Sequence, residues 1–76
     1  MTGLKQINER CWIDKDAPEF SIIVGFDIKQ EKVIYRISNG KKYVCFAEDN
    51  YISESQLYDR IFLPGKRAIE AQESLG

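Results

Sequence analysis

The sequence contains no histidine, only two cysteines and two prolines, and no long apolar run. Without histidine, the chain lacks the side chain that proteins use most often for acid–base catalysis near neutral pH. A tetrahedral zinc site would have to combine cysteine with carboxylates, which structural zinc sites seldom do. There is also no glycine-rich loop that could hold a phosphate. We therefore expect neither an enzyme nor a protein that holds a metal or an organic cofactor.

The two cysteines, Cys11 and Cys45, lie far apart in the sequence, and neither belongs to a CxxC motif. We expect two reduced thiols that are at least partly buried. The longest aliphatic run, residues 22–24, is far too short to span a membrane. Because the N-terminus carries no secretion signal, we expect a cytoplasmic protein that does not bind a membrane.

The composition is that of one small globular domain, with 76 residues, 43% of them apolar and 30% charged. The net charge is −1, so no overall field attracts the protein to nucleic acid or to anionic lipid. The aspartates and glutamates lie in predicted polar turns, such as residues 14–19 and 48–50, or on strand faces that we expect to be exposed. Exposed carboxylates keep their ordinary pKa, so we expect none of them to act as a general acid or base.

Residues 20–28 alternate between apolar and small or polar side chains, as in a strand with one buried face. The predicted buried face carries Phe20, Ile22, Val24, Phe26 and Ile28, and the other face carries Ser21, Ile23, Gly25 and Asp27. A glycine inside a strand often marks a bulge or a bend, and we expect one at Gly25.

Residues 33–46 form a second pattern of this kind, interrupted by Asn39-Gly40. Asn-Gly favours the two-residue type I′ turn of a hairpin, in which Arg36 would face Tyr43 and Tyr35 would face Val44. The predicted core face carries Val33, Tyr35, Ile37, Val44 and Phe46, and the predicted water face carries Ile34, Arg36, Ser38, Lys41, Tyr43 and Cys45. With residues 20–28, this hairpin predicts a three-stranded antiparallel meander.

The two ends of the chain show helical patterns. In residues 2–13, Leu4, Ile7, Cys11 and Trp12 have nearly helical spacing, which predicts a short helix, although the last two residues of this stretch could equally open a strand. A capping box at Ser53 and the spacing of later apolar residues predict a helix over residues 54–62, ended by Pro64. We therefore divide the chain into three segments: an N-terminal helix or arm and loop (1–19), the sheet with its closing helix (20–63), and a helical or flexible tail (64–76).

The expected fold is α+β and rich in strands: a bent antiparallel meander or partial barrel with a short C-terminal helix. The predicted core consists of Phe20, Ile22, Val24, Phe26, Val33, Tyr35, Ile37, Val44, Phe46, Leu57 and Ile61. Residues 20–63 resemble a small SH3-like barrel of the Tudor or KOW type, and this resemblance implies binding of peptides, modified side chains or nucleic acid. A Tudor-like aromatic cage needs several rings, and the sequence offers only Tyr43 and Tyr51 for it.

The remaining residues favour a small protein that docks on a larger protein, such as a regulator or inhibitor of a phage or another mobile element. The candidate protein-binding residues are Tyr43, Tyr51, Tyr58, Arg36 and Lys41. The alternative is a module that binds single-stranded nucleic acid, such as RNA, through Arg36, Lys41, Lys42 and Tyr43. The sequence leaves open whether copies of the chain associate with one another.

Overall fold

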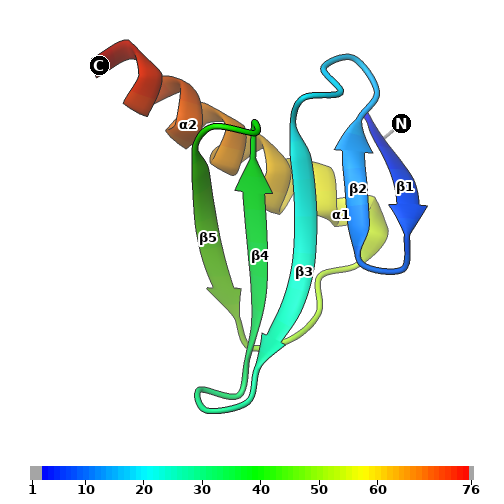
Figure 1. The fold of residues 1–76 in the computed structure, drawn as a ribbon. Coiled ribbons are helices and arrows are strands. Elements are labelled where there is room, and N and C mark those ends of the chain that lie inside the picture. Colours follow the sequence, from blue (N-terminus) through cyan, green and yellow to red (C-terminus); the bar gives the residue numbers. More distant parts are fainter. Residues whose placement is uncertain (1–2, 76) are drawn as a thin grey trace.

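The computed structural model describes residues 3–75 and has two layers, a five-stranded antiparallel sheet and a helix that crosses one of its faces (Figure 1). The strands follow one another in chain order across the sheet and are β1 (Leu4–Asn8), β2 (Cys11–Asp14), β3 (Ser21–Asp27), β4 (Lys32–Ser38) and β5 (Tyr43–Glu48). The helical layer consists of α1 (Glu54–Leu57), the π-helical turn η1 (Tyr58–Phe62) and α2 (Leu63–Leu75). The predicted α+β fold is confirmed in the form of an open meander.

The predicted N-terminal helix is wrong, because this part of the chain forms the hairpin of β1 and β2. Leu4 and Trp12 have nearly helical spacing but lie on two adjacent strands, both with buried side chains. The turn between these strands is stabilised locally, since the Asn8 side-chain carbonyl accepts a hydrogen bond of 2.9 Å from the Arg10 N–H. The sheet therefore begins at Leu4, well before the segment in which we expected it.

The β4–β5 hairpin forms, but its turn lies one residue further along the chain than predicted. Gly40, with a φ of 91°, occupies the first central position, and the Asn39 side chain accepts hydrogen bonds from the N–H groups of Lys41 and Lys42. The turn is not the predicted type I′, because that type needs a positive φ at both central residues and Lys41 at the second position has none. Moving the turn by one residue shifts the strand pairing by two residues, so that Val44 lies opposite Ile37 and not opposite Tyr35 as predicted. Side chains alternate with a period of two, so both faces of the hairpin keep the residues assigned to them.

The pairing of β3 with β4 runs without a register shift from Ser21 to Asp27. The bulge expected at Gly25 is therefore not formed, and Gly25 lies opposite Ile34 in a regular ladder.

The core lies between the helix and the sheet. Its buried apolar residues are Leu4, Trp12, Phe20, Ile22, Val24, Val33, Tyr35, Ile37, Leu57, Ile61, Phe62 and Ile69. Phe26 was expected here but is 50% exposed, because β3 extends beyond the region that the helix covers (Figure 1). Val44 and Phe46, on the outermost strand β5, are only partly buried. Ile28 lies in the following turn and is largely exposed.

The helix begins after Ser53, as predicted, but the predicted capping box is not formed, because the Ser53 side chain makes no capping hydrogen bond. The sequence predicted that the helix ends at Pro64, whereas it continues to Leu75. A proline ring inside an α-helix collides with the carbonyl four residues earlier. Here η1 widens the helix directly before Pro64, with the Leu63 N–H donating to the carbonyl of Tyr58. Such a π-turn re-aims the preceding carbonyls, so the chain can remain helical. Among residues 3–75, no helix is long and apolar enough to cross a membrane.

Asp14 corrects the expectation that every carboxylate lies in a turn or on an exposed face. This residue ends β2 and is only 1% exposed. Its side chain accepts a hydrogen bond from the Asp16 N–H and lies 3.5 Å from the Lys66 Nζ atom on α2. The ion pair therefore connects the sheet to the helix and compensates the buried charge.

Candidate functional site

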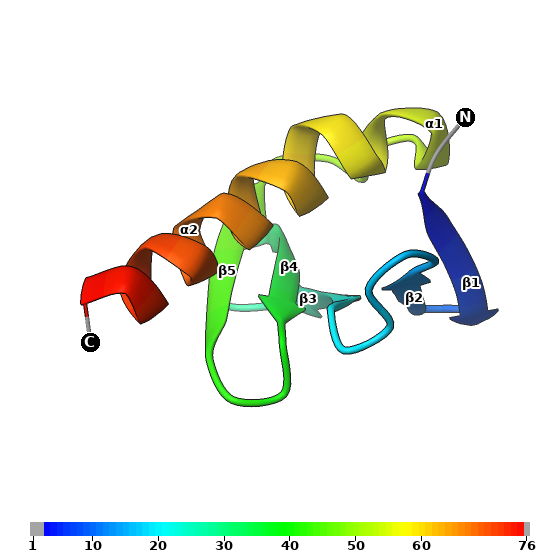
Figure 2. The same cartoon turned by 90° about the horizontal axis from the view of Figure 1, so that it is seen from above.

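The helical layer covers only one face of the sheet. Figure 2 shows α1 and α2 on one side of the strands and no helix on the other side. Within the described part of the chain, the second face is therefore open to solvent. Its side chains are those that alternate away from the core, and they come from all five strands.

The centre of this open face is apolar. Ile23 lies on the middle strand β3 and is 46% exposed, and Ile13 and Ile34 on the neighbouring strands are partly exposed. Gly25 follows on the same face, and a Cβ atom added to it would meet no other atom within 4 Å. The open face therefore has isoleucines around a place where the sheet backbone itself can be reached.

Arg36 and Tyr43 border this apolar centre on the β4–β5 side. The Arg36 guanidinium carbon lies 4.1 Å from the centroid of the Tyr43 ring, and the tyrosine is 55% exposed. Cys45, not Tyr43, lies directly opposite Arg36, so the contact runs diagonally between the strands. This cation–π contact holds two long side chains in one arrangement. We call Ile13, Ile23, Gly25, Ile34, Arg36 and Tyr43 the open-face patch.

The other predicted binding residues lie elsewhere. Lys41 is exposed in the β4–β5 turn, and Lys42 alternates to the side of the hairpin that faces the helix. Tyr51 is 67% exposed and follows β5, at the end of the sheet that lies away from this turn. Tyr58 is partly buried, with its ring stacked on that of Phe62 at a centroid distance of 5.5 Å. Of the proposed residues, the structure brings only Arg36 and Tyr43 into contact.

The isoleucines of the open-face patch were not among the predicted binding residues. The alternation in residues 20–28 and 33–46 placed Ile23, Gly25 and Ile34 correctly on the face that looks away from the core. The available signal was the occurrence of two isoleucines on a face that was expected to be suited to water. Ile13 gave no such signal, because the sequence left open whether Ile13 belongs to a helix or opens a strand.

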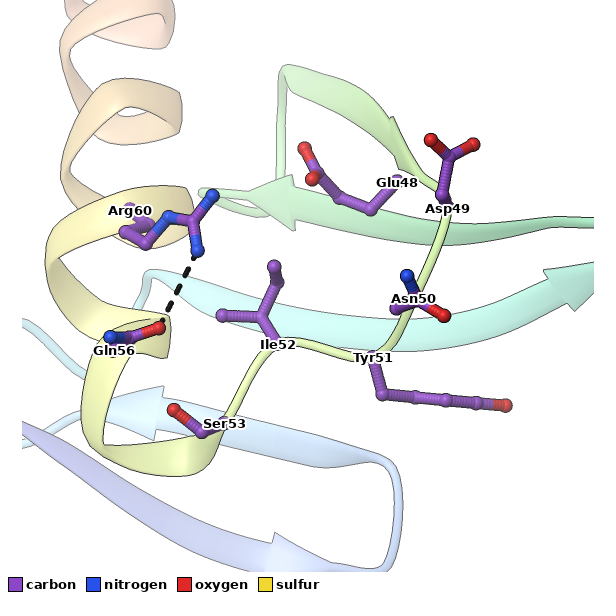
Figure 3. Close-up of a pocket in the computed structure, with 8 residues that line it drawn as sticks. All are labelled: Glu48, Asp49, Asn50, Tyr51, Ile52, Ser53, Gln56 and Arg60. Carbon is purple, nitrogen blue, oxygen red and sulfur yellow. Dashed lines mark hydrogen bonds between the residues drawn. The ribbon is translucent and has the colours of Figure 1, made fainter.

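A surface cavity of about 450 Å³ lies at the end of the sheet, between residues 49–53 and the first helical turns (Figure 3). Its lining residues are Glu48, Asp49, Asn50, Tyr51, Ile52, Ser53, Gln56 and Arg60. The cavity wall is held by two hydrogen bonds: the Ile52 N–H donates to the Tyr35 hydroxyl at 2.8 Å, and the Arg60 Nη1 donates to the Gln56 Oε1 at 3.4 Å. In Figure 3 the Tyr51 ring points away from the other lining residues.

One acidic group of this cavity, the Asp49 carboxyl, is held in its ionised form by a neighbouring lysine. A hydrogen bond from Lys32 and the charge of its ammonium group lower the pKa of the Asp49 carboxyl. A lowered pKa keeps the carboxylate ionised, whereas a general acid at neutral pH needs a raised one. Among residues 3–75, no group of three or more Cys, Asp and Glu side chains is placed to hold a metal ion. The open-face patch is therefore the stronger candidate for a functional site.

Comparison of the chain with family models, with curated proteins and with solved structures found no match.

Proposed function

We propose that this protein is a non-catalytic binding module, a small regulator or inhibitor that docks on a larger protein through the open-face patch. The observation that supports this proposal is the exposure of Ile23. It lies on the central strand of the sheet, with 46% of its surface accessible, on the face that no helix covers. An isoleucine at the centre of a sheet face usually lies under another layer of the protein.

Burial of this patch supplies a favourable free energy for docking. Removing apolar surface from water contributes about 25 cal/mol per Å². Apolar side chains that gather on an exposed face often mark a site of interaction. Arginine and tyrosine are the residue types that most often contribute strongly to protein interfaces, and Arg36 and Tyr43 lie together at the border of the patch.

The composition of the patch favours a protein partner over nucleic acid. Single-strand binding needs a cationic groove along the phosphates and several rings that stack on bases. The patch offers one ring, that of Tyr43, and one cation, that of Arg36, next to an apolar centre.

The test is a pull-down with tagged protein from a lysate of the organism that encodes the chain, with and without nuclease. The informative variant is Ile23→Ser, which removes the apolar centre of the patch. The matched control is Ile28→Ser, because Ile28 is 82% exposed but lies in the turn after β3. Thermal unfolding of both variants verifies that each is folded.

The proposal predicts one protein band in stoichiometric amount that survives nuclease, is lost with Ile23→Ser and is kept with Ile28→Ser. A band that both variants retain equally would contradict docking through the patch. Nuclease-sensitive nucleic acid that is lost with Arg36→Ala and Tyr43→Ala would overturn the proposal in favour of nucleic-acid binding.

A further inference from the structure

The sheet has two edges, and they differ in how well they could pair with another strand. The β1 edge is irregular, because its register shifts between Gln6 and Asn8. The β5 edge is regular over its whole length, with six consecutive residues paired to β4. It contains no proline and no bulge, the usual devices by which proteins protect an edge strand.

We propose that β5 pairs in antiparallel orientation with β5 of a second copy of this chain, so that one continuous sheet extends through a symmetric dimer. This interface uses the edge of the sheet, whereas the proposed docking uses its open face. The two proposals are therefore independent of one another.

The backbone groups available for this pairing follow from the hairpin. The Asn39 N–H donates to the Lys42 carbonyl at 3.1 Å, so Lys42 directs its backbone carbonyl toward β4. In an antiparallel ladder, alternate residues direct their N–H and C=O groups to the same side. Tyr43, Cys45 and Ala47 therefore direct these groups outward, away from β4.

The charges at the two ends of β5 select one register. Lys41 and Lys42 precede the strand, and Glu48 and Asp49 lie at its C-terminal end. When Cys45 lies opposite Cys45 of the second copy, Lys42 faces Glu48 and Lys41 faces Asp49. Twofold symmetry forms each of these pairs twice. Opposite charges that face each other on adjacent strands stabilise a sheet.

Other registers lose this complementarity. Those that are shifted by two residues place Lys42 opposite Phe46, or Glu48 opposite Val44. Asp49 already forms an ion pair with Lys32, so we expect the contact between Lys42 and Glu48 to be the principal one.

The same register also pairs apolar side chains on the helix-covered face. Val44 and Phe46 are partly buried within one copy, because no strand follows β5. Each would lie opposite the other across the dimer axis, and aromatic side chains pair favourably with β-branched ones. Figures 1 and 2 show that α2 lies in a separate layer and projects past β5, so the added strand would continue beneath it.

The test is analytical ultracentrifugation of the full chain over a range of concentrations, with charge variants of β5. Lys42→Glu places two glutamates opposite each other, and Glu48→Lys places two lysines opposite each other. Because each contact occurs twice, we expect either single variant to weaken the dimer about tenfold or more. The double variant Lys42→Glu/Glu48→Lys should regain the association, and so should a mixture of the two single variants.

A backbone variant provides an independent readout. The Cys45 N–H points away from β4, so Cys45→Pro removes no hydrogen bond within one copy. We expect this variant to be folded, by circular dichroism, and monomeric, whereas the control Cys45→Ser should dimerise like the parent chain. A chain that is monomeric at all concentrations would overturn the proposal. The proposal would also be overturned if neither single charge variant weakened the dimer, or if the double variant did not restore it.

Discussion

At the scale of single residues, stability depends on which side chains lie under the helix. Phe62 and Phe26 have the same chemistry but opposite surroundings. Phe62 is 0% exposed and contacts the rings of Phe20 and Tyr58, whereas Phe26 is 50% exposed. The energetic importance of an apolar residue therefore follows from its position relative to α1 and α2.

Phe62→Ala should lower the free energy of unfolding by about 3–5 kcal/mol, because it opens a cavity in the core. Phe26→Ala should lower it by about 1 kcal/mol or less, since solvent already reaches this ring. Urea unfolding of both variants measures the difference. Equal losses would contradict the arrangement in which the helix leaves the far end of β3 uncovered.

The two cysteines should differ in reactivity. Both thiols were expected to be at least partly buried, but Cys45 is exposed, because it lies on the open face of the outermost strand β5. Cys11 is partly buried, and this burial raises the pKa of its thiol. Because the thiolate is the reactive form, Cys45 should react first with a thiol reagent at mildly alkaline pH. The Cys11 rate should keep rising as the pH increases toward its raised pKa. Single-cysteine variants, Cys11→Ser and Cys45→Ser, assign each rate, and a faster reaction at Cys11 would contradict the placement of the two thiols.

At the scale of elements, the close approach of α2 to β4 depends on Gly65. A Cβ atom at this position would lie 2.8 Å from the Ile37 Cγ1 atom. Glycine normally destabilises the middle of a helix, so its presence here is explained by packing rather than by helix propensity.

Gly65→Ala should therefore destabilise the protein, by about 1–2 kcal/mol, although alanine is the better helix former. Gln72→Ala is the control, because this residue is exposed on the same helix and the substitution should be neutral or slightly stabilising. Thermal unfolding compares the two variants. Higher stability of Gly65→Ala would contradict the contact between α2 and β4.

Strands in which apolar and polar side chains alternate clearly could be predicted from the sequence. Elements that depend on contacts between distant residues could not. The alternation of Ile22, Val24, Tyr35 and Ile37 identified β3, β4 and their buried face. Leu4 and Trp12 imitated a helical period because a tight turn returns the chain between them. The helix beyond Pro64 depends on the π-turn η1, for which the sequence gives no local signal.

At the scale of the whole molecule, the single helical layer explains why one face of the sheet is buried and the other is exposed. Ile22 and Val24 of β3 are buried beneath the helix, while Ile23 between them is exposed on the other face. The position of Arg36 and Tyr43 on the open face, at the border of the patch, could be predicted from the alternation of side chains. The apolar centre could not, because its importance depends on the absence of a second covering layer over the described residues.

The central claim is that a partner docks on the open-face patch, and a substitution at Gly25 tests it most directly. The backbone at Gly25 does not require glycine, and a side chain there meets open space. Gly25→Val should therefore keep the fold and raise the free energy of unfolding by about 0.5–1 kcal/mol, because valine favours strands and restricts the unfolded chain. The same side chain fills the place where a partner would approach the sheet.

The measurement is the affinity of Gly25→Ala and Gly25→Val for the captured partner, next to the melting temperature of each variant. We predict that affinity falls from glycine to alanine to valine while the melting temperature stays constant or rises. Undiminished affinity of the stable Gly25→Val protein would contradict docking on this face.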